Sequence, residues 1–284
     1  MKALLFVAWA TLGCSIDWSL ARRTAPPDAA GGAGGAGGAG GAGGTGGAAA
    51  IQNALIRCGE VEPLASAPAI DGVLEPNLTL LRWLDQTEPE LPPGMQVDVA
   101  LAYRPDGLYF YFDVQDPSLN PAPLDALSYC GDGVELYVDD DGVIQAPPAY
   151  DSPGTMQFIV AGPTSASSPA RRGQRFTFPN APSGDSTDLG EWTSNDFVAV
   201  ATSRGYAVEA FVVARDLDLD TWALAPGAKI GWNMSFNVGG PESAGIDACT
   251  TRSQQFHFRL ASSGACTPPY CNASALCTPT LAVQ

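Results

Sequence analysis

The chain has 284 residues, with 14 Lys or Arg against 30 Asp or Glu, and its formal charge at pH 7 is −16. Nucleic-acid binding relies on Lys and Arg contacts to phosphate, so this balance argues against a nucleic-acid partner, and it disfavours anionic membrane surfaces for the same reason. The charge does not argue against neutral ligands or cations as partners. Hydrophobic residues make up 45% of the chain, enough to build a core, and 24 prolines with 32 glycines indicate many turns and few long helices.

The N-terminus has the features of a targeting segment. Lys2 precedes an apolar stretch, Ala3 to Leu12, that is too short to span a bilayer as a helix. The stretch ends in Thr11-Leu12-Gly13-Cys14, which resembles the lipobox of bacterial lipoproteins. That resemblance implies a signal peptide over residues 1–14 and a lipid anchor on Cys14. It also implies export to the bacterial cell envelope, at the outer membrane or cell surface, with the domain in the periplasm or outside. The alternative is an ordinary signal peptide in which Cys14 is incidental.

The next segment, residues 15–50, is predicted to be a flexible linker. Residues 31–47 read GGAGGAGGAGGAGGTGG and offer no apolar face to bury. As a random coil this stretch would reach roughly 20 to 25 Å. We therefore expect one folded domain over residues 51–262, followed by a Cys- and Pro-rich C-terminal extension over residues 263–284.

Alternation of apolar residues predicts an all-β fold. Val97 to Tyr103 and Leu108 to Val114 alternate on either side of the turn Pro105-Asp106-Gly107, which is typical of a hairpin with one buried face. Further strands are predicted over residues 134–138, 156–161, 175–178, 197–202, 206–214, 229–238 and 254–260. About nine short strands without a long helical period indicate an antiparallel β-sandwich, immunoglobulin-like or jelly-roll-like, with short helical turns only.

Six cysteines besides Cys14 suggest disulfides in an exported chain. They are Cys58, Cys130, Cys249, Cys266, Cys271 and Cys277. Six cysteines allow fifteen pairings, and the spacing does not choose among them. With a single histidine and no zinc-ribbon spacing, a structural zinc site is not expected.

An ordered series of short motifs resembles a known family. The pieces are Ile70-Asp71-Gly72, Trp83, Val99 to Tyr103, Leu108-Tyr109, Asp116, Asp132 to Tyr137, Gly205-Tyr206 with Glu209, and Gly231-Trp232-Asn233. This series is similar to the family 9 carbohydrate-binding modules of the DOMON-like β-sandwich group and covers about residues 66–260. The resemblance implies a non-catalytic sandwich that binds the ends of poly- or oligosaccharides. It further implies polysaccharide-degrading enzymes as partners and calcium as a bound cation, and it indicates no oligomeric state.

Two sets of residues are candidates for sugar binding. Trp83 and Trp232 are expected in the core, whereas Trp192 and Trp222 lie in predicted loops where an exposed ring could stack on a sugar. The second set consists of polar residues opposite the apolar stripes, which would share a sheet face if their strands are neighbours. These residues are Glu135, Tyr137, Glu209, Asn233, Asn237, Gln255, His257 and Arg259. The alternatives are packing for the tryptophans and a solvated outer face for the polar set. Glu135 and Glu209 could also bind backbone or a cation.

Two groups of aspartates offer the oxygen ligands that calcium prefers. Asp139 and Asp141 belong to the run Asp139-Asp140-Asp141-Gly142, which lacks EF-hand spacing and also reads as a turn. Asp113, Asp116 and Asp132 flank the loop after the hairpin.

Three rival functions remain. A Glu135 and Glu209 pair could serve as glycosidase acid and base, but no nucleophile, phosphate-binding or zinc-protease motif is present and we expect no enzyme. A second branch of the DOMON-like group binds haem, and the ligands available for that role are His257, Lys229, Met95, Met156 and Met234. The third rival is a structural or adhesive surface lipoprotein without sugar binding.

Overall fold

The computed structural model describes residues 57–59, 61–83, 91–122, 128–144, 154–164, 170–177, 187–192, 196–240, 252–262, 268–270 and 272–281. All of them belong to one compact unit, Gly47–Gln284. Signal peptide, Cys14 and linker lie outside the described residues, as do Cys249, Cys266 and Cys271.

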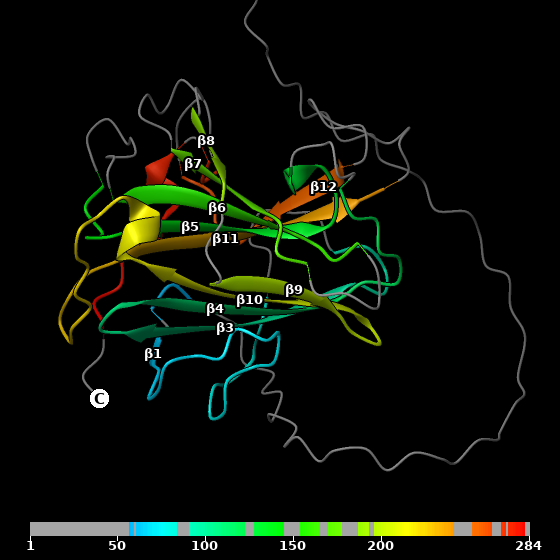
Figure 1. Ribbon diagram of the computed structural model, residues 1–284. Coiled ribbons are helices and arrows are strands. Elements are labelled where there is room, and N and C mark those ends of the chain that lie inside the picture. The colour runs from blue at the N-terminus through cyan, green and yellow to red at the C-terminus, as the bar shows by residue number, and fades with distance from the viewer. Residues whose placement is uncertain are drawn as a thin grey trace, which may run out of the picture. The chain divides into compact units, whose positions relative to one another are not determined.

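The described residues form two six-stranded sheets stacked as two layers (Figure 1). Sheet 1 has the order β1-β3-β4-β10-β9, and β2 also pairs with β3. Its strands are β1 (Glu62–Pro63), β2 (Leu81–Arg82), β3 (Gln96–Arg104), β4 (Gly107–Gln115), β9 (Phe197–Ala201) and β10 (Gly205–Val213). Sheet 2 has the order β12-β11-β5-β6-β7-β8. Its strands are β5 (Gly133–Asp139), β6 (Thr155–Ala161), β7 (Gly173–Thr177), β8 (Thr187–Glu191), β11 (Gly231–Gly239) and β12 (Arg252–His257). The predicted β-sandwich is confirmed.

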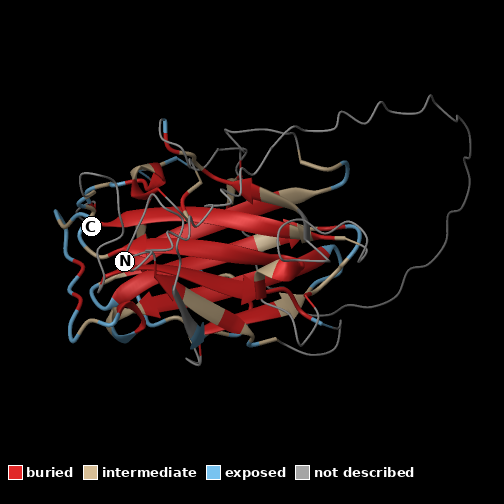
Figure 2. Cartoon of the chain, turned by 90° about the horizontal axis from the view of Figure 1, so that it is seen from above, coloured by how far each residue is buried: buried red, intermediate tan, exposed pale blue. Residues whose placement is uncertain are grey.

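The predicted hairpin is β3 and β4, paired antiparallel so that Val99 lies opposite Phe112 and Leu101 opposite Phe110. Successive side chains of a strand point to opposite faces, so these residues all face the second sheet. The inner residues of β5, β6, β11 and β12 meet them there, and Figure 2 shows that the central strands are buried along most of their length. Each such buried apolar side chain contributes about 1.5–3 kcal/mol.

Both outer faces of the sandwich are also covered. Leu64, Leu78 and Leu80, from the segment before β2, pack against outer residues of sheet 1 such as Tyr109 and Phe211. On sheet 2, Ala273 and Leu276 pack against Tyr137, Ile159 and Phe176. The outer face expected to be solvated is therefore covered in part by the chain's own segments.

The C-terminal segment is part of the sandwich. Trp232 of β11 and Cys277 exchange backbone hydrogen bonds of 2.9 and 2.8 Å, and Lys229 forms an antiparallel bridge with Thr280. A disulfide joins Cys277 to Cys58, 219 residues apart in sequence. Cys130 is also disulfide-bonded. The described part of the segment predicted as an extension thus continues the edge of sheet 2.

Helical structure in the described residues is limited to 3₁₀ turns: η1 (Ser128–Cys130), η2 (Ala214–Leu217) and η4 (Ala273–Ala275). Among these residues, none of the helical stretches has the length and apolar character needed to cross a bilayer.

Candidate functional site

A buried carboxylate organises the outer face of sheet 2. Tyr137 Oη donates to Glu135 Oε2 at 2.5 Å, and Gln157 Nε2 donates to the same oxygen at 2.8 Å. Asn237 Nδ2 and Gln255 Nε2 each donate to Glu135 Oε1 at 2.8 Å. Four donors from four strands therefore converge on one carboxylate. We call these five residues the Glu135 face.

Strand register brings the Glu135 face together. Tyr137 on β5 lies opposite Gln157 on β6, and Asn237 on β11 lies opposite Gln255 on β12. β11 pairs with β5, and in this pairing Ser235 lies opposite Glu135. Residues that lie opposite each other on neighbouring strands point to the same side of the sheet, and so do residues two apart on one strand. All five side chains therefore lie on one face of sheet 2. This agrees with the prediction for Glu135, Tyr137, Asn237 and Gln255.

The short helix η1 borders the Glu135 face. Ser128 N donates to Gln174 Oε1 of β7 at 2.7 Å, which ties η1 to sheet 2. Tyr129 is partly buried and packs on the cluster containing Tyr137 and Ile159, with its ring 6.2 Å from Phe176. An aromatic ring with an accessible part therefore lies beside the polar network. Asn237 Oδ1 is buried and has no hydrogen-bond partner in the described part of the chain.

Three other predicted residues of this face hold local structure. Asn233 Nδ2 donates to the Ala275 carbonyl at 2.7 Å, and Arg259 Nη1 donates to the Leu276 carbonyl at 3.0 Å. His257 Nδ1 lies 2.6 Å from Ser235 Oγ, and its ring lies 5.9 Å from that of Tyr270. Asn233 and Arg259 thus fasten the C-terminal segment to the sheet.

Glu209 lies on the other sheet. Its Oε2 accepts hydrogen bonds from the N–H groups of Asp71 at 2.8 Å and Gly72 at 2.7 Å, and its Oε1 accepts from Tyr109 Oη at 2.9 Å. Gly72 has a φ of +87°, and a side chain there would collide with Val200. Burial raises the pKa of Glu209 to about 7, although its hydrogen bonds oppose the rise. Glu209 therefore anchors the Ile70-Asp71-Gly72 turn, and its predicted place on a shared face with Glu135 is wrong.

This placement removes the Glu135–Glu209 pair as an acid and base, and it removes the pairing of His257 with Met156 or Met234 as haem ligands. Glu135 and Glu209 lie on the outer faces of different sheets, so they cannot act together as acid and base on one glycosidic bond. Met156 and Met234 are buried between the sheets, whereas His257 lies on the outer face of sheet 2. These groups cannot share one haem iron.

The expected exposure of Trp192 and Trp222 is wrong. Trp192 is 3% exposed, its ring stacks on Phe197 with centroids 4.4 Å apart, and its Nε1 donates to Asp216 Oδ1 at 3.1 Å. Trp222 is 9% exposed and donates to the Asp140 carbonyl at 3.1 Å. Both rings belong to the core between the sheets. Loop position alone did not reveal that the loops fold back over the sandwich.

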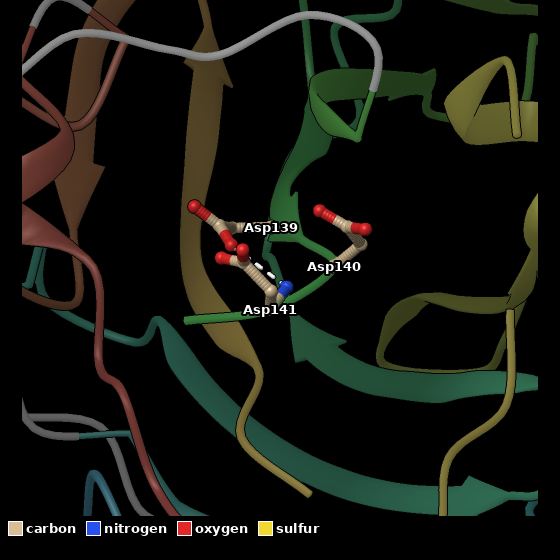
Figure 3. Close-up of side chains that lie close together, drawn as sticks. All are labelled: Asp139, Asp140 and Asp141. Atoms are coloured by element: carbon tan, nitrogen blue, oxygen red, sulfur yellow. Dashed lines mark hydrogen bonds between the residues drawn. The ribbon is translucent and has the colours of Figure 1, made fainter. Parts of the chain in front are cut away.

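The aspartate run after β5 forms a turn. Asp139, Asp140 and Asp141 each bring one carboxylate oxygen within 4.8 Å of the others. Asp139 Oδ1 accepts hydrogen bonds from the N–H groups of Asp141 at 3.1 Å and Gly142 at 2.8 Å; Figure 3 shows the first of these. Asp139 is buried and Asp141 is exposed. The hydrogen bonds that the Asp139 carboxylate accepts from the following backbone N–H groups are typical of an Asx turn, here at the end of β5.

Asp113, Asp116 and Asp132 do not form one group. Arg204 Nη2 pairs with Asp113 Oδ2 at 2.7 Å on the outer side of sheet 1. Asp116 and Asp132 are both buried, and Asp132 accepts hydrogen bonds from the Gly239 and Asn120 N–H groups. Of the three aspartates predicted to form a calcium site, only Asp116 and Asp132 lie near each other.

Two residues of this region were missed from the sequence. Gln157 occupies a strand that the sequence did predict, and the alternation Met156-Gln157-Phe158 could have revealed it as an outward polar residue. Tyr129 follows a proline-rich loop and belongs to no periodic pattern, so no sequence signal placed it beside Glu135.

Comparison with known proteins identifies the fold. No protein-family model matches the sequence, and no curated protein matches it significantly. A family 9 carbohydrate-binding module from Caldicellulosiruptor kristjanssonii in complex with cellotriose has a TM-score of 0.50 at 16% identity, over 79% of this chain and 94% of that one. The same kind of module from that organism in complex with glucose has a TM-score of 0.48 at 17% identity, over 79% and 95%. The described part of this chain is therefore a β-sandwich with the fold of a family 9 carbohydrate-binding module, as the order of its motifs predicted.

Proposed function

We propose that the sandwich is a non-catalytic module that binds the ends of poly- or oligosaccharides through the Glu135 face. The observation that carries this proposal is the convergence of Tyr137, Gln157, Asn237 and Gln255 on one carboxylate. Sugar hydroxyls donate and accept hydrogen bonds in fixed directions, and planar carboxylate and amide groups match them.

Binding would exchange internal hydrogen bonds for bonds to the sugar. Gln255 is partly exposed at the edge of the Glu135 face, so its amide can turn from Glu135 to a ligand hydroxyl. The buried Oδ1 of Asn237 would accept from another hydroxyl. Tyr129 supplies an aromatic surface at the rim for the apolar face of a pyranose. Since the network is already assembled, little side-chain entropy would be lost on binding.

We also propose that Cys14 carries a lipid anchor and that residues 15–50 tether the sandwich to the cell envelope. A flexible tether would let the module reach polysaccharide and hold the cell, or a partner polysaccharide-degrading enzyme, near it. This proposal rests on the sequence of residues 1–50.

Calorimetric titration with glucose, xylose and cello-oligosaccharides tests the sugar-binding proposal. Cellotriose is the first ligand to try because the similarly folded module was solved with it. We expect saturable binding, and we expect Gln255→Ala to weaken it by about ten-fold, the equivalent of one lost hydrogen bond of about 1.4 kcal/mol.

Gln254→Ala is the matched control, because Gln254 precedes Gln255 on β12 and alternation turns its side chain to the other face. Affinity should survive that change. Flat titrations of the unmutated protein with every sugar would refute the proposal and favour a structural or adhesive role. Equal losses in the two variants would show that the ligand does not contact the Glu135 face.

A further inference from the structure

The turn η1 holds Tyr129 between two anchored neighbours. Ser128 and Cys130 are 1% and 3% exposed, whereas Tyr129 is only partly buried. The Ser128 amide donates to Gln174 Oε1 at 2.7 Å, and Cys130 is disulfide-bonded. Because Cys58 and Cys277 bond to each other, the partner of Cys130 lies outside the described residues. The residues on both sides of Tyr129 are therefore attached to other parts of the chain, while part of Tyr129 itself remains accessible.

Strand register places the contacts of η1 on the outer face of sheet 2. Phe176 lies opposite Gln157, a member of the Glu135 face, and Gln174 lies two residues before Phe176 on β7. Gln174 and Phe176 therefore point to the same side of the sheet as Gln157. The Tyr129 ring meets the Phe176 ring edge-on, with centroids 6.2 Å apart and 63° between the planes. Tyr129 thus packs on the direct cross-strand neighbour of a residue of the Glu135 face.

A turn as short as η1 depends on tertiary contacts for its position. It has three residues, and a 3₁₀ helix of that length has few hydrogen bonds of its own and poor hydrogen-bond geometry. It also lies outside the strands of both sheets. Cys130 packs with Ala122 and Tyr129 in a small cluster apart from the main core. The Cys130 disulfide adds a covalent attachment to this packing, and the hydrogen bond to Gln174 adds a polar one.

A fixed aromatic ring binds a sugar more tightly than a mobile one, because less conformational freedom is lost on binding. Residues that do not touch the ligand can supply this by locking the side chain that does. We infer that Cys130 and Gln174 are positioning residues for Tyr129. The disulfide and the hydrogen bond hold the ring at the border of the Glu135 face, as a preformed platform for the apolar face of a sugar. This inference rests on the proposed sugar-binding function. Because disulfides persist in oxidising compartments, the platform is complete only there.

Two variants separate the anchors from the ring. Peptide mapping by mass spectrometry without reduction identifies the cysteine bonded to Cys130, and Cys130→Ser is combined with serine at that position so that no unpaired thiol remains. Gln174→Ala keeps every disulfide, and it decides the test if the first variant does not unfold cooperatively. In both variants, amide hydrogen exchange should become faster in the peptide containing Tyr129, while β5 stays protected. A free Cys130 thiol in the unmutated protein would overturn the inference.

Calorimetric titration with cellotriose measures the effect on affinity. We expect loss of the disulfide to weaken binding by about five-fold and Gln174→Ala by about three-fold, because the ring must then be ordered on binding. In a Tyr129→Ala background, neither change should weaken binding further, since no ring is left to position. In a Gln255→Ala background both should keep their full effect, because Gln255 lies on β12 and η1 contacts β7, toward the other edge of sheet 2.

The inference is overturned if both variants bind cellotriose as tightly as the unmutated protein. It is also overturned if their losses persist in the Tyr129→Ala background, because the anchors would then act on the whole fold and not on the ring. A flat titration of the unmutated protein with every sugar refutes the proposed function instead. Hydrogen exchange still decides the positioning in that case, since unchanged exchange around Tyr129 in both variants shows that the anchors do not hold it.

Discussion

Glu209 is a buried acid whose surroundings predict a specific pH dependence of stability. Its side chain is 0% exposed, and burial raises its pKa from an ordinary 4.5 to about 7. We predict that Glu209→Gln removes this pH dependence while keeping the fold. The glutamine oxygen can accept from the Asp71 and Gly72 amides, and its nitrogen can donate to the Tyr109 oxygen. Glutamine therefore mimics the protonated acid.

The magnitude follows from linkage between proton binding and folding. A group whose pKa is higher in the folded state stabilises the fold fully below its unfolded pKa, and this stability is lost as pH rises through the folded pKa. The difference between 4.5 and about 7 corresponds to about 3 kcal/mol, at about 1.4 kcal/mol per pKa unit. Relative to Glu209→Gln, the unmutated protein should therefore lose about 3 kcal/mol of unfolding free energy between about pH 4 and about pH 8.5.

Urea unfolding followed by tryptophan fluorescence, at several pH values across this range, measures the effect. Other buried acids titrate in both proteins, so the difference between the two curves isolates Glu209. Glu191→Gln alters an exposed glutamate and should give a curve parallel to that of the unmutated protein. If the Glu209→Gln curve is also parallel, the reasoning about Glu209 is refuted.

Two further predictions concern stability. Replacing both Cys58 and Cys277 by serine should lower the unfolding free energy by about 5 kcal/mol, because the disulfide closes a loop of more than 200 residues. Denaturant titration measures this free energy, and a loss below about 1 kcal/mol would contradict the prediction. Trp192→Phe should lower the unfolding free energy by about 1–3 kcal/mol, because it removes the buried hydrogen bond to Asp216. The same change should leave any sugar affinity unchanged. A loss of sugar binding without a loss of stability would show that Trp192 contacts the ligand.

The strands and their buried faces follow from local pattern. Val97 to Tyr103 and Leu108 to Val114 alternate, and every apolar position of that pattern faces the core. Alternation is a property of neighbouring residues in one strand, so a single sequence reveals it. It also correctly oriented Glu135, Tyr137, Asn237 and Gln255 away from the core.

Alternation could not decide which outer face a polar residue occupies. Glu135 and Glu209 have the same local pattern, yet one gathers four side-chain donors on sheet 2 and the other anchors a turn over sheet 1. Strand order is set by contacts between distant segments, such as β10 beside β4 and β11 beside β5. The tertiary structure likewise buried Trp192 and Trp222 and placed residues 276–281 on the edge of sheet 2. In each case long-range packing decided the outcome, because it depends on which segments meet and the local sequence does not specify that.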